Sequence, residues 1–385
     1  MYQNFRKHLQ QELEGIRNAG LYKTERIITS PQNAKIEVKG GKQVLNMCAN
    51  NYLGLADHPE VIKAAQEGTA KRGYGLSSVR FICGTQDIHK ELEQKISAFL
   101  GTEDTILYGS CFDANGGLFE TLLGPEDAII SDALNHASII DGIRLSTARC
   151  IRFRHNDLVQ LERLLEQHHA TFRQLIIVTE SIFSMDGDQA DLTALVRLKK
   201  RYSNVLLYVD EAHAFGVRGP RGLGCAEETG CIRDIDFLVG TFGKAAASAG
   251  AYIACCRTIR EYLVNRMRTL IFTTALPPTS IAWTLFIVRK LARMQDHREH
   301  LARISRTLRE ALQAKGYGCP SASHIVPLII GPSADTVLCA ELLQRHGFYA
   351  LPVRPPTVPE GTSRIRFSLT ADITEQEIEE IIKYI

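Results

Sequence analysis

The sequence predicts an α/β fold, in which a large domain with a mostly parallel β-sheet is followed by a smaller α+β domain. Apolar strand-like segments alternate with helical segments between about residues 60 and 280. Several of these segments are continuous apolar runs, as expected of strands that are buried on both faces. After an apolar helical segment at 281–294 the character changes, and short strands mix with helices as far as the C-terminus.

The chain has 385 residues, which exceeds one small domain and favours a large domain plus a smaller one. We expect an N-terminal helix-and-strand segment at 1–45, a large domain at 46–280 and a small C-terminal domain at 281–385. Residues 1–20 have the pattern of an amphipathic helix, and Gly40-Gly41 marks the turn of a strand pair.

The individual elements follow from short apolar runs and from helical periodicity. The expected strands of the large sheet are 104–109, 127–131, 150–154, 174–180, 205–211, 237–241 and 251–256. Helices are expected at 113–123, 157–169 and 194–203 of the large domain, while the small domain should contain strands at 324–330 and 364–369 and a final helix at 375–385.

Composition excludes several classes of function. The formal net charge is +2, which gives no electrostatic reason to expect nucleic acid as a partner. No apolar run reaches the roughly 18 residues that cross a bilayer, and the charged start lacks the core of a signal peptide. The ten cysteines show no CxxC pair and no zinc spacing, so we expect reduced thiols in a cytoplasmic protein and no metal site.

Polar residues follow five of the expected strands directly. The segments are 109–112, 135–136, 180–184, 210–213 and 241–244. Ligands of an open α/β sheet bind beyond the carboxyl ends of its strands, so these residues predict a ligand site at that edge. Ordinary turn chemistry would explain any one of the five, but it explains all five together less well.

Two of these residues point to pyridoxal phosphate (PLP). Lys244 follows a strand and a glycine and precedes small residues; a desolvated lysine has a lowered pKa and a nucleophilic amine, which suits a Schiff base. Considered alone, it would more often be a solvated surface lysine at a turn. Asp210 ends a run of five apolar residues, and a protonated pyridine nitrogen would be a suitable partner for a buried carboxylate there, although a helix cap or a metal ligand are alternatives. The loop 109–112 precedes a helix and could bind a phosphate through backbone N–H groups.

Eight ordered motifs carry a resemblance to a known family. They are NNYLGLADHP (50–59), CGTQDIHKELE (83–93), SDALNHASIIDG (131–142), FSMDGD (183–188), VDEAHAFGVRGPRGLG (209–224), TFGK (241–244), TTALPP (273–278) and RPPTVPEGTSRIR (354–366). Over nearly its whole length the chain resembles the α-oxoamine synthases, PLP enzymes of the aspartate-aminotransferase fold, fold type I. These enzymes condense an amino acid with an acyl-CoA and usually release CO2.

The resemblance implies roles for the residues at the cofactor ring. Lys244 looks like the Schiff-base lysine and, once freed, like the acid/base that moves the α-proton. Asp210 looks like the partner of the pyridine nitrogen, His213 like the donor to the 3′ oxygen, and His136 like the ring that stacks on the pyridine. A histidine in a polar loop is otherwise more often a surface residue.

The resemblance also implies residues for the phosphate and the substrates. The backbone of Cys111 and Phe112 and the hydroxyl of Thr241 match phosphate ligands, and Ser184 lies beside the cofactor in relatives. Thr273 and Thr274 match residues that reach the phosphate of the neighbouring subunit, which implies a homodimer with shared sites. Asn50, Thr357 and Arg366 match substrate-binding positions, and a bidentate Arg suits a carboxylate. Arg366 could instead lie on the solvent face of a strand.

The members of the family differ in substrate, and the two halves of the chain resemble different members. Residues 354–374 resemble members that join L-alanine to a pimeloyl thioester, carried by CoA or by a carrier protein. The front half, including 77–101 and 110–124, resembles members that join glycine to acetyl-CoA. We weigh the back half more, because the small domain and the TFGK region contact substrate in relatives.

The sequence differs from its relatives at two places, and one non-enzymatic class of protein with this fold has to be considered. Relatives usually carry glycines soon after the lysine, whereas the run 245–250 here is rich in alanine and could narrow an acyl channel. Cys111 stands where many relatives have glycine. Regulators of this fold bind PLP without turnover but carry an added DNA-binding domain, and the first 40 residues here are too few and not basic.

Overall fold

The computed structural model describes residues 2–385 of the chain. By their contacts these residues form two compact units. The large unit comprises Asn50–Ser184 and Asp188–His300, and the small unit comprises the segment up to Ala49, Met185–Gly187 and Leu301–Ile385. The chain passes from one unit to the other within helix α12 (Gln295–Ala314).

A seven-stranded sheet forms the centre of the large unit, with strand order β3-β9-β8-β7-β6-β4-β5. The strands are β3 (Asp104–Tyr108), β4 (Ala128–Asp132), β5 (Arg149–Phe153), β6 (Leu175–Glu180), β7 (Val205–Asp210), β8 (Phe237–Thr241) and β9 (Ala251–Cys255). Five neighbouring strands, from β8 to β5, are parallel, and only β9 runs antiparallel to its neighbours β3 and β8. All seven expected strands and the mostly parallel sheet are therefore confirmed.

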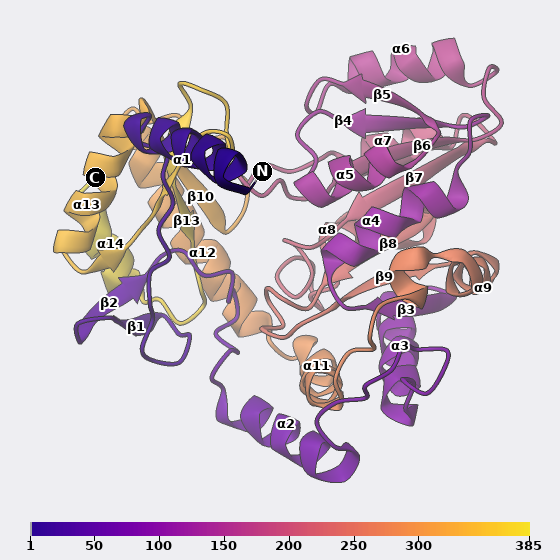
Figure 1. The fold of residues 1–385 in the computed structure, drawn as a ribbon, viewed down its shortest axis with the longest axis horizontal. Helices are drawn as coiled ribbons and strands as arrows, with labels where there is room; N and C mark the ends of the chain where they lie inside the picture. The colour runs from indigo at the N-terminus through magenta and orange to yellow at the C-terminus, as the bar shows by residue number, and fades with distance from the viewer. Residues whose placement is uncertain (1) are drawn as a thin grey trace. The chain divides into compact units, whose positions relative to one another are not determined.

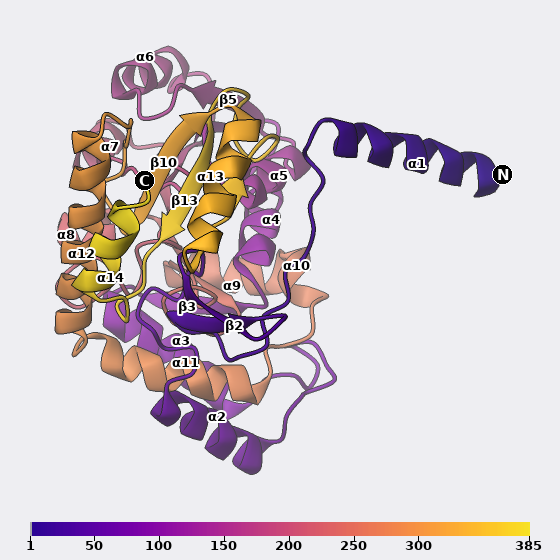
Figure 2. The ribbon, with the colours of Figure 1, turned by 90° about the vertical axis from the view of Figure 1, so that its left-hand side faces the viewer.

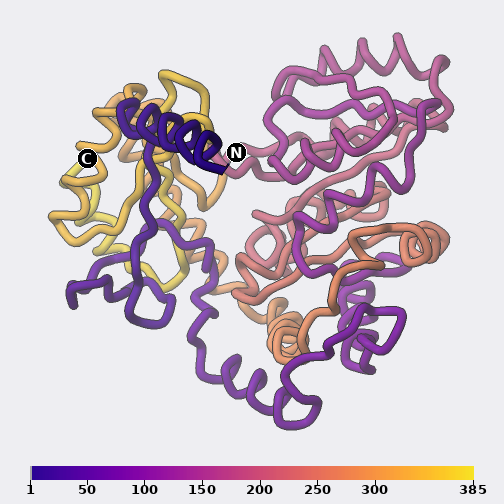
Figure 3. Tube along the Cα trace, viewed as in Figure 1, coloured from indigo at the N-terminus to yellow at the C-terminus, as the bar shows by residue number. Residues whose placement is uncertain are grey.

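Helices connect the parallel strands of the large unit. Its helices between the strands and up to residue 271 are α4 (Cys111–Leu122), α5 (Ala137–Leu145), α6 (Leu158–His168), α7 (Leu192–Lys199), α8 (Cys225–Glu228), a 3₁₀ turn at Ile232–Asp234, α9 (Arg257–Arg266) and α10 (Arg268–Ile271). The trace runs from β4 through α5 to β5 and through α6 to β6 (Figure 3). Strands β4, β6 and β7 are buried along almost their whole length, which explains their continuous apolar sequences.

Three further helices of the large unit pack on one another: α2 (Pro59–Arg72), α3 (Asp87–Leu100) and α11 (Pro278–Leu291). Figure 2 shows α11 lying along α2, and Gly68 of α2 comes so close to Ala282 of α11 that a Cβ at residue 68 would lie 2.3 Å from the Cβ of Ala282. The sequence placed residues 281–300 with the C-terminal domain. In the structure the division by contacts falls after residue 300, because α11 packs on these helices of the large unit.

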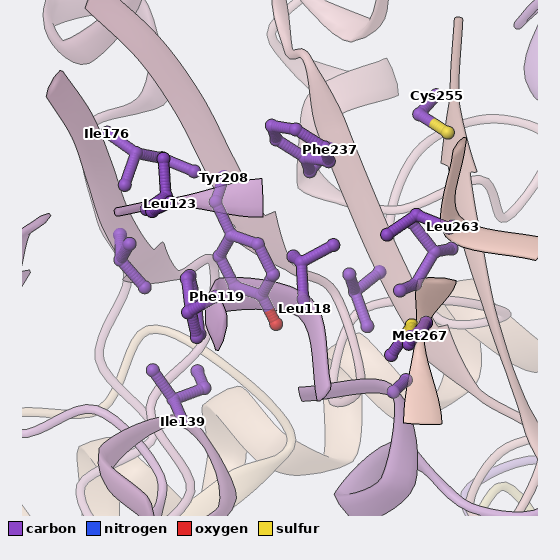
Figure 4. Close-up of a cluster of buried hydrophobic side chains, with 14 of the residues drawn as sticks. Leu118, Phe119, Leu123, Ile139, Ile176, Tyr208, Phe237, Cys255, Leu263 and Met267 are labelled. Carbon is purple, nitrogen blue, oxygen red and sulfur yellow. The ribbon is translucent and has the colours of Figure 1, made fainter. Parts of the chain in front are cut away.

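A cluster of buried apolar side chains lies between the sheet and helices α4, α5 and α9. Figure 4 shows Tyr208 of β7 among Leu118, Phe119 and Leu123, with its hydroxyl oxygen at the end of the ring that points away from Ile176. The rings of Phe119 and Tyr208 are tilted, with centroids 5.4 Å apart. The core therefore holds two tyrosine hydroxyls: that of Tyr208 donates to Asn115 of α4, and that of Tyr108 donates to the sulfur of Met267 at 3.1 Å.

The small unit contains two short sheets and four helices (Figure 1). Its elements are α1 (Tyr2–Asn18), β1 (Lys35–Val38), β2 (Lys42–Asn46), most of α12, β10 (Ile325–Gly331), α13 (Ser333–Arg345), β11 (Phe348–Tyr349), β12 (Pro352–Val353), β13 (Ser363–Ser368) and α14 (Glu375–Ile382). The predicted β1–β2 pair is antiparallel around Gly40-Gly41, and β10 and β13 pair antiparallel as well. Helix α1 has no buried residue.

Two features are absent from residues 2–385. No helix in that range is both long and apolar enough to span a membrane. Over the same range no group of three or more His, Cys, Asp or Glu side chains is arranged to hold a metal ion.

Candidate active site

The carboxyl ends of the parallel strands bring the predicted residues to one edge of the large sheet. Glu180 ends β6 and pairs in register with Asp210, which ends β7. Thr241 ends β8, the next strand, and Lys244 follows it within a short loop. His136 follows β4 and directly precedes α5. Parallel strands place their carboxyl ends at the same edge, which is why residues more than a hundred positions apart meet here.

Lys244 belongs to a chain of hydrogen bonds that reaches Asn50. Its Nζ lies 2.9 Å from Nε2 of His213, and Nδ1 of that ring lies 2.8 Å from the hydroxyl of Tyr52. The Tyr52 hydroxyl donates to Oδ1 of Asn50 at 2.9 Å, so its oxygen is left to accept from His213 Nδ1. Three of the predicted residues are thus linked, and the fully buried Tyr52 connects them.

Asp210 is the buried carboxylate of the site, with 4% of its surface exposed. Its oxygens accept hydrogen bonds from the backbone N–H of Ala212 at 2.8 Å and from Nδ2 of Asn115 at 3.1 Å. Among residues 2–385 no Lys, Arg or His forms an ion pair with it within 4.0 Å. A buried carboxylate requires a cationic partner or several donors, so Asp210 fits a ligand that brings a positive charge, such as a protonated pyridine nitrogen.

Helix α4 begins beside Asp210 and supplies an anion site. Ser110 caps it: the Ser110 hydroxyl oxygen accepts from the backbone N–H of Asp113 at 3.0 Å. The N–H groups of Cys111 and Phe112, at the first two positions of the helix, have no partner within a helix. Such groups, together with the helix dipole, bind phosphate readily. The expectation of a helix N-terminus at this loop is confirmed.

His136 lies exposed directly before α5, and its ring accepts hydrogen bonds from Ser138. Nδ1 lies 2.7 Å from the Ser138 hydroxyl and 3.2 Å from the Ser138 backbone nitrogen. Partial burial lowers the pKa of His136; the Asp210 carboxylate opposes this effect and the Lys244 ammonium adds to it. The ring is therefore favoured in its neutral form.

Glu180, beside Asp210, was placed at this edge by the sequence as part of the segment 180–184, but it was given no role. It is buried, and both burial and the neighbouring Asp210 carboxylate raise its pKa well above the usual range. Two carboxylates at adjacent strand ends therefore differ in their surroundings, because Asp210 has two hydrogen-bond donors while Oε1 of Glu180 has no partner among residues 2–385. Ser184 follows four residues later and is half-buried.

The alanine-rich run after Lys244 forms a loop between β8 and β9. The Thr241 hydroxyl donates to the carbonyl of Gly250 and accepts from the N–H of Gly243, each at 3.2 Å, so it closes the loop around the lysine. Ala247 has φ 45°, in the left-handed region that glycine adopts without strain. The alanine run therefore adds methyl groups and places one of them on a backbone conformation that favours glycine.

Thr273 and Thr274 lie next to this edge on an extended segment. Thr274 forms an isolated bridge with Val79, and a Cβ at Gly109 would lie 3.6 Å from Cγ2 of Thr273. Around them, Phe81, Ile82 and Phe272 each expose more than half of their surface. The two threonines thus lie close to the loop 109–112 and to the exposed apolar residues Phe81, Ile82 and Phe272, which we call the 81/82/272 patch.

Two predicted substrate residues belong to the small unit. Arg366 lies on β13, where its guanidinium donates to the Ser368 hydroxyl. Thr357 lies exposed in the loop between β12 and β13. On the same strand Arg364 is buried and forms an ion pair with Asp186, a residue of the FSMDGD motif. Arg364 and Arg366 therefore have different neighbours, although the alternation R-I-R places both on the same face of the strand.

Comparison with known proteins agrees with this geometry. The family model of aminotransferase class I and II matches residues 42–385. The chain is 47% identical over 350 residues to an 8-amino-7-oxononanoate synthase from Haemophilus ducreyi, across 89% of this chain and 90% of the relative. It is 46% identical over 377 residues to a 2-amino-3-ketobutyrate coenzyme A ligase from Escherichia coli K12, across 97% and 94%.

A solved serine palmitoyltransferase from S. paucimobilis, carrying a PLP–myriocin aldimine, has a TM-score of 0.91 and 30% identity, and covers 98% of this chain and 95% of that one. This chain belongs to the α-oxoamine synthase family of PLP enzymes. As a member of that family it is an acyltransferase, it has the type I fold expected from the motifs, and its cofactor is PLP.

The sequence missed four residues that this α-oxoamine synthase builds into the site: Tyr52, Asn115, Ser138 and Tyr208. Tyr52 stands inside the NNYLGLADHP motif, and Ser138 stands inside SDALNHASIIDG. Asn115 lies one helical turn after Cys111, so a predicted helix that began at residue 111, as the observed one does, and not at 113 would have placed both on one face. Tyr208 carried no signal beyond its place in an apolar strand.

Proposed function

We propose that this α-oxoamine synthase joins L-alanine to a pimeloyl thioester, giving 8-amino-7-oxononanoate, CO2 and CoA in biotin biosynthesis. The observation that carries this choice is residues 354–374, whose sequence RPPTVPEGTSRIRFSLTADIT resembles that of enzymes with this activity. The segment includes Thr357 and Arg366, which we assign to substrate binding, with Arg366 and Asn50 as the groups for the substrate carboxylate. The relative from Haemophilus ducreyi bears the name of this activity.

A second candidate is glycine C-acetyltransferase activity, in which glycine and acetyl-CoA give 2-amino-3-oxobutyrate. It is favoured by the front half of the chain and by the relative from Escherichia coli, named 2-amino-3-ketobutyrate coenzyme A ligase. The identities to the two relatives are 47% and 46%, so overall identity does not separate the activities. The two candidates share the cofactor and the chemistry and differ in both substrates.

For either pair of substrates, we assign the cofactor to the edge of the large sheet. Lys244 would hold the aldehyde carbon, Asp210 the pyridine nitrogen and His213 the 3′ oxygen, with the ring of His136 against the pyridine face. The amides of Cys111 and Phe112 and the hydroxyl of Thr241 would hold the phosphate, with Ser184 nearby. When bound, PLP supplies an electron sink for the charge that develops at the α-carbon of the amino acid.

The chain's own residues would then move protons and orient the acyl group. The Lys244 amine takes the α-proton of the amino acid and returns a proton after CoA has left, as a lysine of lowered pKa can near neutral pH. His213 Nε2 lies within hydrogen-bond distance of that amine and so can fix its direction. The Asp210 carboxylate, kept buried, favours a protonated partner opposite it, and His136 orients the acyl carbonyl.

We also propose that two copies share their sites and that the enzyme acts in the cytoplasm. The 81/82/272 patch supports a dimer, because exposed apolar groups of this size mark interaction surfaces. Thr273 and Thr274 border this patch and would reach the phosphate of the second copy. All ten cysteines are free thiols, as in a reducing compartment.

Release of CoA distinguishes the two candidate activities. The purified enzyme should release CoA from L-alanine plus pimeloyl-CoA at least about tenfold faster than from glycine plus acetyl-CoA, at equal subsaturating concentrations. Activity with only the second pair would refute the first candidate in favour of the second. Lys244→Ala should abolish both activities and the absorbance near 420 nm of the bound cofactor.

Mixing two impaired variants tests the shared site. One variant is Lys244→Ala and the other is the double variant Thr273→Ala/Thr274→Ala. If the threonines serve the neighbouring subunit, a mixed dimer contains one site with both defects and one intact site. Activity should then rise well above that of either parent after co-refolding. No rise, with mixed dimers demonstrated by differently tagged subunits, would show that the threonines do not act across subunits.

A further inference from the structure

A buried chain of polar side chains begins at Tyr208 and ends at the edge of the site. Tyr208 of β7 and Asn115 of α4 are fully buried, and Ser138 of α5 is 1% exposed. The Tyr208 hydroxyl bonds to Oδ1 of Asn115, and Nδ2 of Asn115 lies 3.1 Å from Oδ2 of Asp210 and 3.0 Å from the Ser138 hydroxyl. Side chains from β7, α4 and α5 thus meet at the amide group of Asn115.

The direction of these bonds follows from the first of them. Burial raises the pKa of Tyr208 well above its usual range, and the nearby negative charge of Asp210 raises it further, so the hydroxyl keeps its proton and donates it. The acceptor is the amide oxygen of Asn115. The amide NH2 must therefore face the other way, where its two hydrogens match two acceptors, the Asp210 carboxylate and the Ser138 oxygen.

The bond from Asn115 in turn fixes the hydroxyl of Ser138. Because the Ser138 oxygen accepts from Asn115, its single O–H is free to donate to Nδ1 of His136 at 2.7 Å. The backbone N–H of Ser138 points at the same nitrogen from 3.2 Å. A backbone N–H can only donate, so Nδ1 of His136 has to be the unprotonated, accepting nitrogen, and the proton of the neutral ring is on Nε2.

We propose that Asn115 is a positioning residue that sets two site residues at once: it orients the Asp210 carboxylate directly, and through Ser138 it fixes His136 as the Nε2–H tautomer. With this tautomer His136 offers the active site a hydrogen-bond donor and no basic nitrogen. This proposal rests on the assignment of Asp210 and His136 to the cofactor site. It does not depend on which amino acid or thioester the enzyme uses.

The charged groups around His136 agree with this arrangement. The Lys244 ammonium disfavours a second positive charge on the ring, and Asp210, which would favour one, is already held by Asn115 and Ala212. The thiol of Cys111, whose pKa is raised by burial and by Asp210, remains protonated and lies 3.7 Å from Oδ2 of Asp210 as a third, weak donor. Asn115, Ala212 and Cys111 thus all donate to the Asp210 carboxylate, and His136 is not among these donors.

The test reads the tautomer of His136 directly. The holoenzyme is labelled with ¹⁵N-histidine, and its imidazole nitrogens are followed by NMR between pH 6 and 9 in the absence of substrate, with His136→Asn to identify the resonances. We expect neutral His136 protonated on Nε2 throughout the upper part of this range. A proton on Nδ1 of the neutral ring would overturn the proposal, whatever substrates the enzyme turns over.

Ser138→Ala breaks the chain between Asn115 and His136 with the loss of one oxygen atom. Without the donor to Nδ1 the neutral form is favoured less, so the His136 titration and the acid limb of the kcat/KM profile should both move up by about half a pH unit or more. The matched control is Ser97→Ala, a buried serine that bonds to Thr105 and Glu93 in another part of the large unit.

Ser97→Ala should move neither the His136 titration nor the pH profile, even if it lowers stability. Identical titrations in Ser138→Ala and the wild type would overturn the role of the chain. Tyr208→Phe removes the hydroxyl that donates to Asn115 and keeps the ring. It is the alternative test if Ser138→Ala does not fold. Because the Ser138 N–H still points at Nδ1, the variant should keep the Nε2–H tautomer but move the His136 titration up, as Ser138→Ala does; an unchanged titration in Tyr208→Phe would contradict the proposed orientation of Asn115.

Discussion

Two histidines follow adjacent parallel strands of the large sheet and have opposite surroundings. His136 comes after β4, and His155 comes shortly after β5. His136 accepts two hydrogen bonds at Nδ1, both from Ser138. His155 instead bonds at both nitrogens to carboxylates: Nδ1 lies 2.9 Å from Oδ1 of Asp132, and Nε2 lies 2.7 Å from Oδ2 of Asp188.

The partners of each ring decide its charge. Burial alone would lower the pKa of His155, but the hydrogen bonds to Asp132 and Asp188 outweigh it and raise the pKa to about 10. For His136, burial and Lys244 prevail and its pKa is lowered. At neutral pH His155 is therefore an imidazolium ion held between two carboxylates, while His136 stays neutral at the carboxyl edge of the sheet.

The comparison teaches that position at a strand end does not make a histidine part of the chemistry. His155 joins the loop after β5 to Asp188, whose backbone carbonyl accepts from the N–H of Phe183, and its ring meets the Phe183 ring edge-on at 4.4 Å. It therefore stabilises the segment that leads to Ser184. We therefore expect substitution by asparagine to lower mainly the activity at His136 and mainly the stability at His155.

The largest effect is expected for His136→Asn. Asparagine can still accept from the Ser138 N–H and cap α5, but it lacks the ring and the Nε2–H donor. Under the proposed role, kcat/KM should fall on the order of 10³-fold, within the range for a positioned donor, while the midpoint of urea unfolding changes little. A variant with near-normal kcat/KM would remove His136 from the mechanism and leave it as a helix cap.

His155→Asn should act the other way round. Removing the cation leaves the carboxylates of Asp132 and Asp188 facing each other without compensation, and breaking a buried pair in this way costs about 3 kcal/mol of unfolding free energy. Urea unfolding at pH 7 measures this loss, and kcat/KM of the folded enzyme should stay within about threefold. His297→Asn, at an exposed position of α12, is the matched control and should cost less than about 0.5 kcal/mol. An equally stable His155→Asn would contradict the ion-pair assignment.

Much of the fold and part of the site could be predicted from the sequence, because they depend on local patterns. The seven strands were visible as short apolar runs, and Lys244 and Asp210 stood out as charged residues directly after such runs. Their cofactor followed from chemistry and from the family resemblance. The boundary of the units did not follow, since it depends on how α11 packs on α2 and α3.

The hydrogen-bond partners could not be predicted, because they lie far apart in the chain. Asp132 and Asp188 are 23 and 33 positions from His155, and Asn115 is 95 positions from Asp210. No local pattern gives the pairing of side chains from a helix, a strand end and a loop. Sequence reasoning therefore assigned no role to His155 or to Asn115.

The smallest effect, and the one that sharpens the comparison most, is the dependence of stability on pH. His155 has a folded-state pKa of about 10 against an ordinary value of 6.5, so its stabilising contribution is complete below pH 6.5 and disappears as the pH rises through 10. The difference in unfolding free energy between wild type and His155→Asn should therefore shrink by on the order of 2–3 kcal/mol between pH 7 and 9. His136, with a lowered pKa, has the opposite sign: its contribution is present above its ordinary pKa and is lost as the pH falls. Urea unfolding of wild type, His136→Asn and His155→Asn at pH 5.5, 7 and 9 measures both trends, and a gap for His155→Asn that stays constant from pH 7 to 9 would show that this ring is not charged in the folded enzyme.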